Sequence, residues 1–412
     1  MKTLIFKLLF LLSYIQLFSQ TIEAPIDYRN PQRGLFKLEY EFGETYNPKL
    51  PTVIVVSDAQ QFYVRKGRIK KIQYELFGKN INVLGLITRG SNQDLMHQYE
   101  VIKKGVIDWR KAYLIFQSYQ FANDLNLLIT EILKDQEDIY LYGQSGGAFL
   151  ITEYLSIFPN SRVKKVFLGS SANPVIENKL GIIHDNFQRD YISMNKLDKT
   201  KLENVLAESF FDRKLVATLF QRQNFFVKLS ELNNKRSELI THLNARDTTF
   251  VNKLKMEYQI DAIKGLLNSE AGIPIRVRLT EFIYPLLEDW KNIERNFYPD
   301  LENSYNIAYP IIELNNKYAF PIFQSFNKES FSKYKGEVFI LSGRYDHIAD
   351  YRSSIYMDAL LENSTLFIAN DDHTFKLLKS ENKYAELIQD FFETNGLKDW
   401  KSRYESYQWK EK

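Results

Sequence analysis

The sequence contains no cysteine among its 412 residues, and this absence removes several kinds of chemistry at once. Disulfide bonds, thiolate zinc sites, iron–sulfur clusters and cysteine nucleophiles are all excluded. Net charge is also scarce: 54 basic and 51 acidic residues leave +3 at pH 7, without the basic excess that nucleic-acid binding needs. Any chemistry must therefore use oxygen and nitrogen groups, and we expect no nucleic-acid partner.

Long apolar runs are missing except at the N-terminus. Residues 1–19 have two lysines near the start, Lys2 and Lys7, followed by a mostly apolar run over residues 8–18. The small residue Ser19 follows, where a signal peptide would be cleaved. The run is shorter than the roughly 20 residues that span a bilayer. We therefore expect a secretory signal peptide, export to a periplasm or the medium, and no membrane anchor after its removal.

Strand-like and helix-like patterns alternate through the first part of the chain. Several of the strand-like runs are apolar with little alternation, which indicates strands covered on both faces. Helical spacing of apolar residues separates them, and strands that alternate with helices form a mostly parallel α/β sheet. These runs lie at residues 35–42, 53–56, 82–87, 139–142 and 163–168.

A change of pattern near residue 174 suggests an inserted helical segment. We expect residues 20–173 to form the first part of the core, residues 174–335 a helical insertion, and residues 336–412 the second part of the core with a C-terminal tail. Strand character returns at 338–341 and 366–368, and a helix is expected over 384–392. The last residues show no clear period, so we expect a loosely docked tail.

The most informative segment runs from a buried strand into Gly143-Gln144-Ser145-Gly146-Gly147 and then directly into a helix. In this Gly-x-Ser-x-Gly pattern the serine occupies a sharp strand-to-helix turn, and the glycines allow strand and helix to approach closely. Ser145 is therefore the candidate nucleophile. The alternative is a glycine-rich turn without a catalytic role.

A serine nucleophile needs a base, and the base needs an orienting carboxylate. His373 follows the last expected strand and precedes the final helix, and Asp346 follows the strand before it. Asp350 is an alternative acid four residues further on, and we expect His347 to be a solvated neighbour of Asp346. The chain order of the candidate triad is thus Ser145, Asp346, His373.

This order and strand context resemble the α/β-hydrolase superfamily, over most of residues 24–173 and 336–395. The segment between resembles the helical cap that many members insert. Finer features resemble the proline iminopeptidase branch of serine peptidases: the opening PIDYRNP at 25–31, Arg89-Gly90-Ser91 after a strand, and Gly343 to Asp346 before the acid. The resemblance implies an α/β-hydrolase fold with a cap, and a catalytic triad of Ser145, Asp346 and His373.

One loop departs from the resemblance. Relatives usually carry a His-Gly-Gly-Pro-Gly type motif after the third strand, whereas this chain has Ser57-Asp58-Ala59-Gln60-Gln61. By resemblance, the oxyanion donors are the amides of Gly146 and Ala59. A carboxylate at Asp58 would repel a developing oxyanion unless it points away.

The sequence thus predicts an aminopeptidase-like serine hydrolase that acts on a small molecule or short peptide through an acyl-serine intermediate. Alternatives are an esterase for small acyl esters and a degenerate hydrolase fold used for binding. No cofactor is required, and we expect no metal site at Asp371, Asp372 and His373, because adjacent residues rarely point at one ion. By resemblance, an acidic cap residue would hold the substrate's amino group; the candidates are Glu177, Asp185, Asp190, Glu281 and Glu288.

Overall fold

The structure is a computed structural model that describes residues 20–59, 63–182, 191, 194–289, 297–323, 326–393 and 400–410. The expected signal peptide lies outside these ranges, so export stays a prediction. Within the described ranges, no helix has the length and apolar character needed to cross a membrane.

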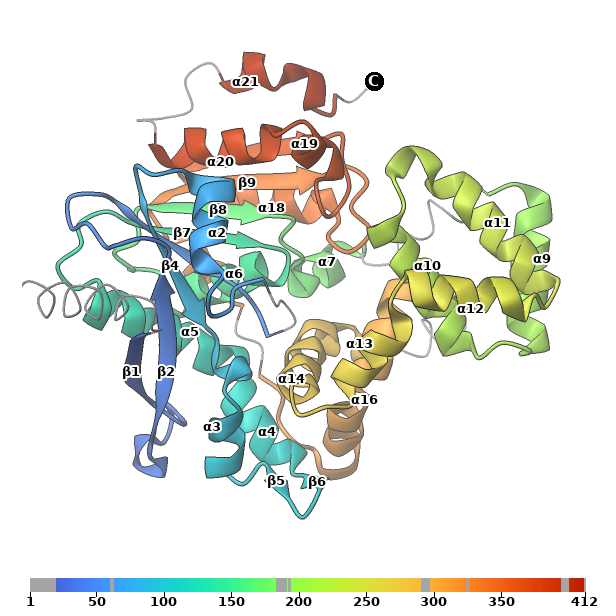
Figure 1. The fold of residues 1–412 in the computed structure, drawn as a ribbon, viewed down its shortest axis with the longest axis horizontal. Helices are drawn as coiled ribbons and strands as arrows, with labels where there is room; N and C mark the ends of the chain where they lie inside the picture. The colour runs from blue at the N-terminus through green and yellow to red at the C-terminus, as the bar shows by residue number, and fades with distance from the viewer. Residues whose placement is uncertain are drawn as a thin grey trace, which may run out of the picture.

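A mostly parallel sheet forms the centre of the molecule, as the sequence predicts (Figure 1). In the described residues it has eight strands, in the order β1-β2-β4-β3-β7-β8-β9-β10. Strand β2 pairs antiparallel with β1 and β4, and the other pairs are parallel. The strands are β1 (Gln20–Pro25), β2 (Leu35–Phe42), β3 (Thr52–Val56), β4 (Asn82–Ile87), β7 (Ile139–Gln144), β8 (Lys165–Gly169), β9 (Glu337–Gly343) and β10 (Ser364–Ala369).

Helices cover both faces of the sheet, which explains why its central strands are apolar throughout. In β3, Val53 and Val55 pack into the apolar cluster on one face, and Ile54 and Val56 into the cluster on the other. Each successive side chain of a strand points to the opposite face. Helices that contribute to the two clusters include α2 (Ile69–Ile72), α19 (Lys376–Ser380) and α20 (Lys383–Glu393) on one side, and α4 (Trp109–Phe116), α5 (Ser118–Leu127), α6 (Gly146–Ile157), α17 (Lys328–Phe331) and α18 (Tyr351–Leu360) on the other.

The described chain between β8 and β9 is helical. Figure 1 shows α9 to α12 on the right, away from the sheet, and α13, α14 and α16 closer to α4. We call α9 to α12 the outer lobe; it has an apolar cluster of its own, to which each of the four helices contributes. The helices are α7 (Pro174–Leu180), α9 (Lys196–Glu208), α10 (Arg213–Phe226), α11 (Leu232–Asn244), α12 (Thr248–Glu257), α13 (Ile260–Leu267), α14 (Gly272–Ile283) and α16 (Pro299–Tyr318).

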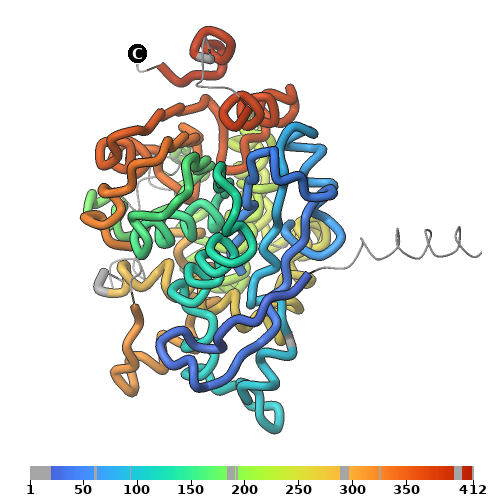
Figure 2. The backbone as a smooth tube through the Cα atoms, turned by 90° about the vertical axis from the view of Figure 1, so that its left-hand side faces the viewer, coloured from blue at the N-terminus to red at the C-terminus, as the bar shows by residue number. Residues whose placement is uncertain are grey.

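The C-terminal segment is docked, and the expectation of a loose tail is wrong. It lies beyond α20 in both views (Figures 1 and 2). The Trp409 amide donates to the Ile368 carbonyl at 2.9 Å, and the Tyr404 side chain is only 1% exposed. Because β10 is the last strand of the sheet, its outer edge has unpaired backbone groups, and this segment supplies partners for them.

Candidate active site

The turn that carries Ser145 is strained. Ser145 stands between β7 and α6 with φ 55° and ψ −124°, a region that residues other than glycine rarely adopt. A Cβ on Gly143 would lie 2.6 Å from the backbone carbon of Gly147, so strand and helix could not approach as they do. The turn therefore presents the Ser145 side chain at the carboxyl end of the sheet.

Ser145, His373 and Asp346 meet in one line of hydrogen bonds. Ser145 Oγ lies 2.8 Å from His373 Nε2, and His373 Nδ1 lies 2.9 and 2.8 Å from the two oxygens of Asp346. His373 is 3% exposed and Asp346 1%. The geometry fits an imidazole that donates from Nδ1 to Asp346 and accepts at Nε2 from the Ser145 hydroxyl. The structure thus brings together the three residues selected from the sequence.

The carboxylate that faces His373 belongs to Asp346 rather than to the alternative, Asp350. Backbone amides of Ile348 and Ala349 donate to Asp346 Oδ1, each at 2.8 Å, and hold the carboxylate in place. Asp350 instead caps α18 and accepts hydrogen bonds from the Arg352 guanidinium at 2.9 and 2.8 Å. Asp350 is therefore occupied in positioning a helix.

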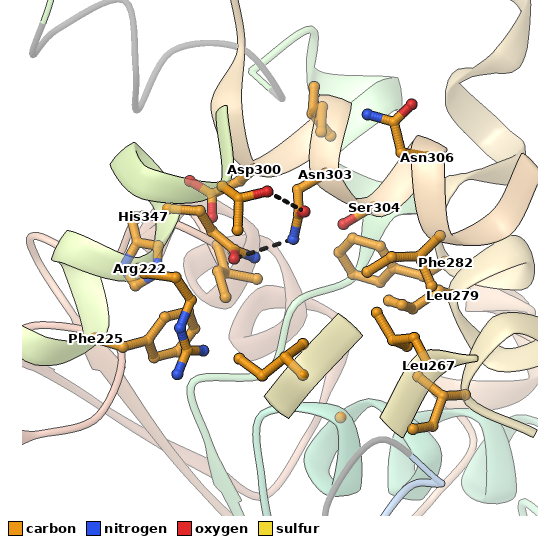
Figure 3. Close-up of a pocket in the computed structure, with 18 of the residues that line it drawn as sticks. Arg222, Phe225, Leu267, Leu279, Phe282, Asp300, Asn303, Ser304, Asn306 and His347 are labelled. Atoms are coloured by element: carbon orange, nitrogen blue, oxygen red, sulfur yellow. Dashed lines mark hydrogen bonds between the residues drawn. The ribbon is translucent and has the colours of Figure 1, made fainter. Parts of the chain in front are cut away.

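A cavity of about 900 Å³ opens over Ser145 and His373, and the helical insertion supplies most of its wall. Figure 3 shows Leu267, Leu279 and Phe282 on one side, and Arg222 and Phe225 on the other. The cavity can hold a small molecule against the Ser145 side chain. The rest of its wall includes Gly146, Phe149, Glu177, Lys214, Ile275, Asp300, Asn303, Ser304, Asn306 and His347.

Comparison with known proteins identifies the family. A family model described as alpha/beta hydrolase fold matches residues 89–380, well over half of the chain. The chain belongs to the α/β-hydrolase fold family. No curated protein sequence matches it.

Solved structures that share the α/β-hydrolase fold resemble the chain at low identity. A bromoperoxidase from Bacillus anthracis is 14% identical, with a TM-score of 0.43, and the match covers 90% of this chain and 98% of that one. An esterase from Exiguobacterium antarcticum is 13% identical (TM-score 0.44; 87% and 96% covered). A proline iminopeptidase from Mycobacterium smegmatis is 10% identical (TM-score 0.45; 91% and 98% covered).

The two expected oxyanion donors of this α/β-hydrolase fold have different surroundings. Gly146 is the first residue of α6, and an amide at that position has no partner within its own helix. The Ala59 amide instead donates to Asp58 Oδ1 at 2.6 Å. Because its single N–H already donates to Asp58, the Ala59 amide is not available to donate to an oxyanion in this structure. Residues 60–62 of the same loop lie outside the described ranges.

The Asp58 carboxylate points into the protein, toward a buried arginine. Arg278 of α14 donates from Nε to Asp58 at 2.9 Å and from a terminal nitrogen to Glu153 at 2.6 Å, and it also pairs with Glu281. All four side chains are 1–2% exposed. We call these four residues the Arg278 cluster. It neutralises the carboxylate that the sequence places near a developing oxyanion, and it ties the insertion to β3 and α6.

Because three carboxyl groups surround one guanidinium in the Arg278 cluster, its contribution to the free energy of unfolding depends on pH. Burial, together with the Glu153 charge, raises the pKa of Glu281 from 4.5 to about 8 despite Arg278. The folded state thus retains a proton on Glu281 that the unfolded chain releases near pH 4.5. The contribution of this proton to the free energy of unfolding is fully present below pH 4.5 and is lost as the pH rises through about 8. In Glu281→Gln this titration is absent, and the free energy of unfolding should fall less between pH 5 and 9 than in the wild type, by at least about 1 kcal/mol.

Denaturant unfolding at several pH values measures this difference. The control is Glu131→Gln, because Glu131 is exposed on the surface and should leave the wild-type pH profile unchanged. Parallel pH profiles for Glu281→Gln and the wild type would show that Glu281 does not titrate in this range.

Two of the acids expected to bind a substrate amino group, Glu281 and Glu177, are buried and poorly suited to bind a charged amine. Glu281 belongs to the Arg278 cluster and accepts from the Ser118 amide at 2.9 Å. Glu177 lines the cavity but is 3% exposed, and burial beside the Asp350 charge raises its pKa well above 4.5. Burial thus favours the uncharged form of both groups. The side chains of Asp185, Asp190 and Glu288 lie outside the description.

His347 is part of the site, and its interpretation as a solvated residue is wrong. Its ring lies 4.9 Å from that of Phe225 and 5.5 Å from that of His373. Its Nε2 atom is enclosed, with no hydrogen-bond partner among the described residues, and burial lowers the pKa of His347 well below 6.5.

Two further residues of the cavity wall, Arg222 and Phe225, were not selected from the sequence. Their spacing of three places them on one helix face, but the sequence does not show which surface that face meets.

Proposed function

We propose that the chain is a serine hydrolase that cleaves small amides or esters through an acyl-serine intermediate. The observation that carries this proposal is the unbroken line of hydrogen bonds from Ser145 through His373 to Asp346, at the floor of a cavity large enough for a small substrate. Nucleophile, base and orienting acid are then within reach of one bound carbonyl group.

In the proposed reaction, Ser145 Oγ attacks the substrate carbonyl carbon while its proton passes to His373 Nε2. The Gly146 amide donates to the oxyanion, and Asp346 stabilises the imidazolium. When the bond to the leaving group breaks, His373 gives its proton to the leaving nitrogen or oxygen. Water then attacks the acyl-serine with His373 again as base, which releases a carboxylic acid and restores Ser145. Side chains, backbone and water supply every step, so the reaction requires no cofactor.

An aminopeptidase is the narrower proposal, supported by the iminopeptidase-like runs at residues 25–31 and 343–346. The uncharged state favoured for Glu177 and Glu281 weakens the case for amine recognition, so an esterase remains the alternative. Turnover of aminoacyl amides selects the peptidase, whereas turnover of chromogenic esters without any cleavage of amides selects the esterase.

Labelling with a fluorophosphonate tests whether the site is active. The wild type should take up one probe per chain on Ser145, because His373 activates only this hydroxyl, and peptide mass spectrometry locates the adduct. Ser145→Ala should take up none. Ser380→Ala, which changes an exposed serine, should react like the wild type. A folded wild-type protein that takes up no probe would instead favour the binding-module alternative.

A further inference from the structure

Arg222 stands in the cavity wall with most of its hydrogen-bonding capacity unused by the described protein. It lies on α10, and its Nε donates to the Tyr258 carbonyl at 3.3 Å. Its guanidinium lies over the Phe226 ring at 4.8 Å and the Phe225 ring at 5.4 Å. These contacts fix the plane of the group. They leave its two terminal nitrogens without a hydrogen-bond acceptor among the described residues.

Two fully buried arginines, Arg89 and Arg278, are paired with carboxylates, whereas Arg222 is only partly buried. Arg89 binds both oxygens of Asp124 at 2.6 Å, and Arg278 binds three acids. Arg222 has no carboxylate within ion-pairing distance in the described ranges, although burial lowers its pKa. A partly buried guanidinium without a counter-charge in the wall of a ligand cavity is suited to bind an anionic group of a ligand, which would supply that charge.

The guanidinium lies on the His373 side of the reaction centre. The Phe225 ring is near both groups: its centroid is 6.1 Å from the His373 ring and 5.4 Å from the Arg222 guanidinium carbon. His373 is the group that gives its proton to the leaving group. A charge bound by Arg222 therefore belongs to the leaving part of the substrate, a few bonds from the scissile carbonyl.

The opposite side of the cavity is apolar. Figure 3 shows Leu267, Leu279 and Phe282 facing Arg222 and Phe225 across the cavity. Ile275 and Phe149 also line the cavity. Apolar side chains favour a hydrocarbon group over a charged one, so this wall suits the acyl part of a substrate.

We propose that Arg222 binds a carboxylate on the leaving group, so that the substrates are acylated amino acids, short peptides or esters of hydroxy acids with an apolar acyl group. This inference rests on the proposed function and names the substrate class of the same site. A planar guanidinium can donate two parallel hydrogen bonds to a carboxylate, which neither a carboxamide nor an ester can accept equally well.

Competition against labelling of Ser145 tests the inference without requiring turnover. N-hexanoyl-alanine and N-hexanoyl-alaninamide differ only in the carboxylate. In the wild type, the acid should slow fluorophosphonate labelling at a concentration at least about tenfold below that of the amide, as expected for a charge-assisted hydrogen bond. In Arg222→Gln the two should become equally effective, and Arg222→Lys should retain part of the preference.

Arg246→Gln is the matched control, because Arg246 is an exposed arginine of the insertion that pairs with Glu208 outside the cavity lining. It should keep the wild-type preference. Equal protection by acid and amide in the wild type, protection by neither, or an unchanged preference in Arg222→Gln would each overturn the inference while labelling persists. A wild type that is not labelled at all would overturn the proposed function, and this inference with it.

Discussion

Ser145→Ala should lower turnover of any acyl substrate by roughly a million-fold, the effect expected for removing the proposed nucleophile where the remaining triad residues act as a unit with it. The physical reason is that alanine leaves no atom to form the acyl intermediate, and His373 Nε2 loses the hydroxyl that lies 2.8 Å away. The measurement is kcat on a chromogenic ester and on an aminoacyl amide.

His373→Ala should lose about as much activity, and the double variant should be no worse than either single one, because the residues act together. Thermal unfolding should show that each variant remains folded. A Ser145→Ala protein that keeps more than about a hundredth of wild-type turnover would contradict the nucleophile assignment, since background binding alone supplies far less.

Arg278→Met should destabilise the folded chain by about 3–5 kcal/mol, the effect of removing one partner from a buried ion pair. Asp58, Glu153 and Glu281 would then face one another without a cation, each only 2% exposed. A domain is stable by only about 5–15 kcal/mol, so the loss is a large share. Denaturant unfolding at pH 5 and pH 8 measures it, and the loss should be smaller at pH 5, where the carboxyl groups take up protons more readily.

Arg278→Lys keeps a positive charge and should lose less, which gives a measurable protein if Arg278→Met does not fold. Arg246→Met removes an exposed arginine from its pair with Glu208 and should change the stability by less than about 1 kcal/mol. If Arg278→Met were no less stable than Arg246→Met, the Arg278 cluster would not stabilise the attachment of the insertion.

The fold and the hydrogen-bonded triad could be predicted from the sequence because their signals are local. The turn at Ser145 needs glycines on both sides of the serine, and Gly143 and Gly147 each lie two residues from it in the sequence. Asp346 and His373 each follow a strand of a parallel sheet, and the carboxyl ends of parallel strands meet at one edge. Chain order and strand context were therefore sufficient to place the three residues together.

The electrostatics of the site could not be predicted, because they depend on distant partners. The sequence shows Asp58 near the expected oxyanion, but the arginine that binds it lies 220 positions away. His347 reads as a solvated neighbour of Asp346 until Phe225 of α10 is packed against its ring. No periodicity within a helix specifies which distant surface that helix will cover, so burial, pKa and pairing at this site came from the structure alone.

The outer lobe has an apolar cluster of its own, whereas the turn that carries Ser145 depends on β7 and α6. The two can therefore diverge at different rates. Descendants of this gene could exchange the residues that meet a new metabolite on α10 while inheriting the reaction centre unchanged. Specificity in such a lineage would shift through the side chains of α10 that line the cavity.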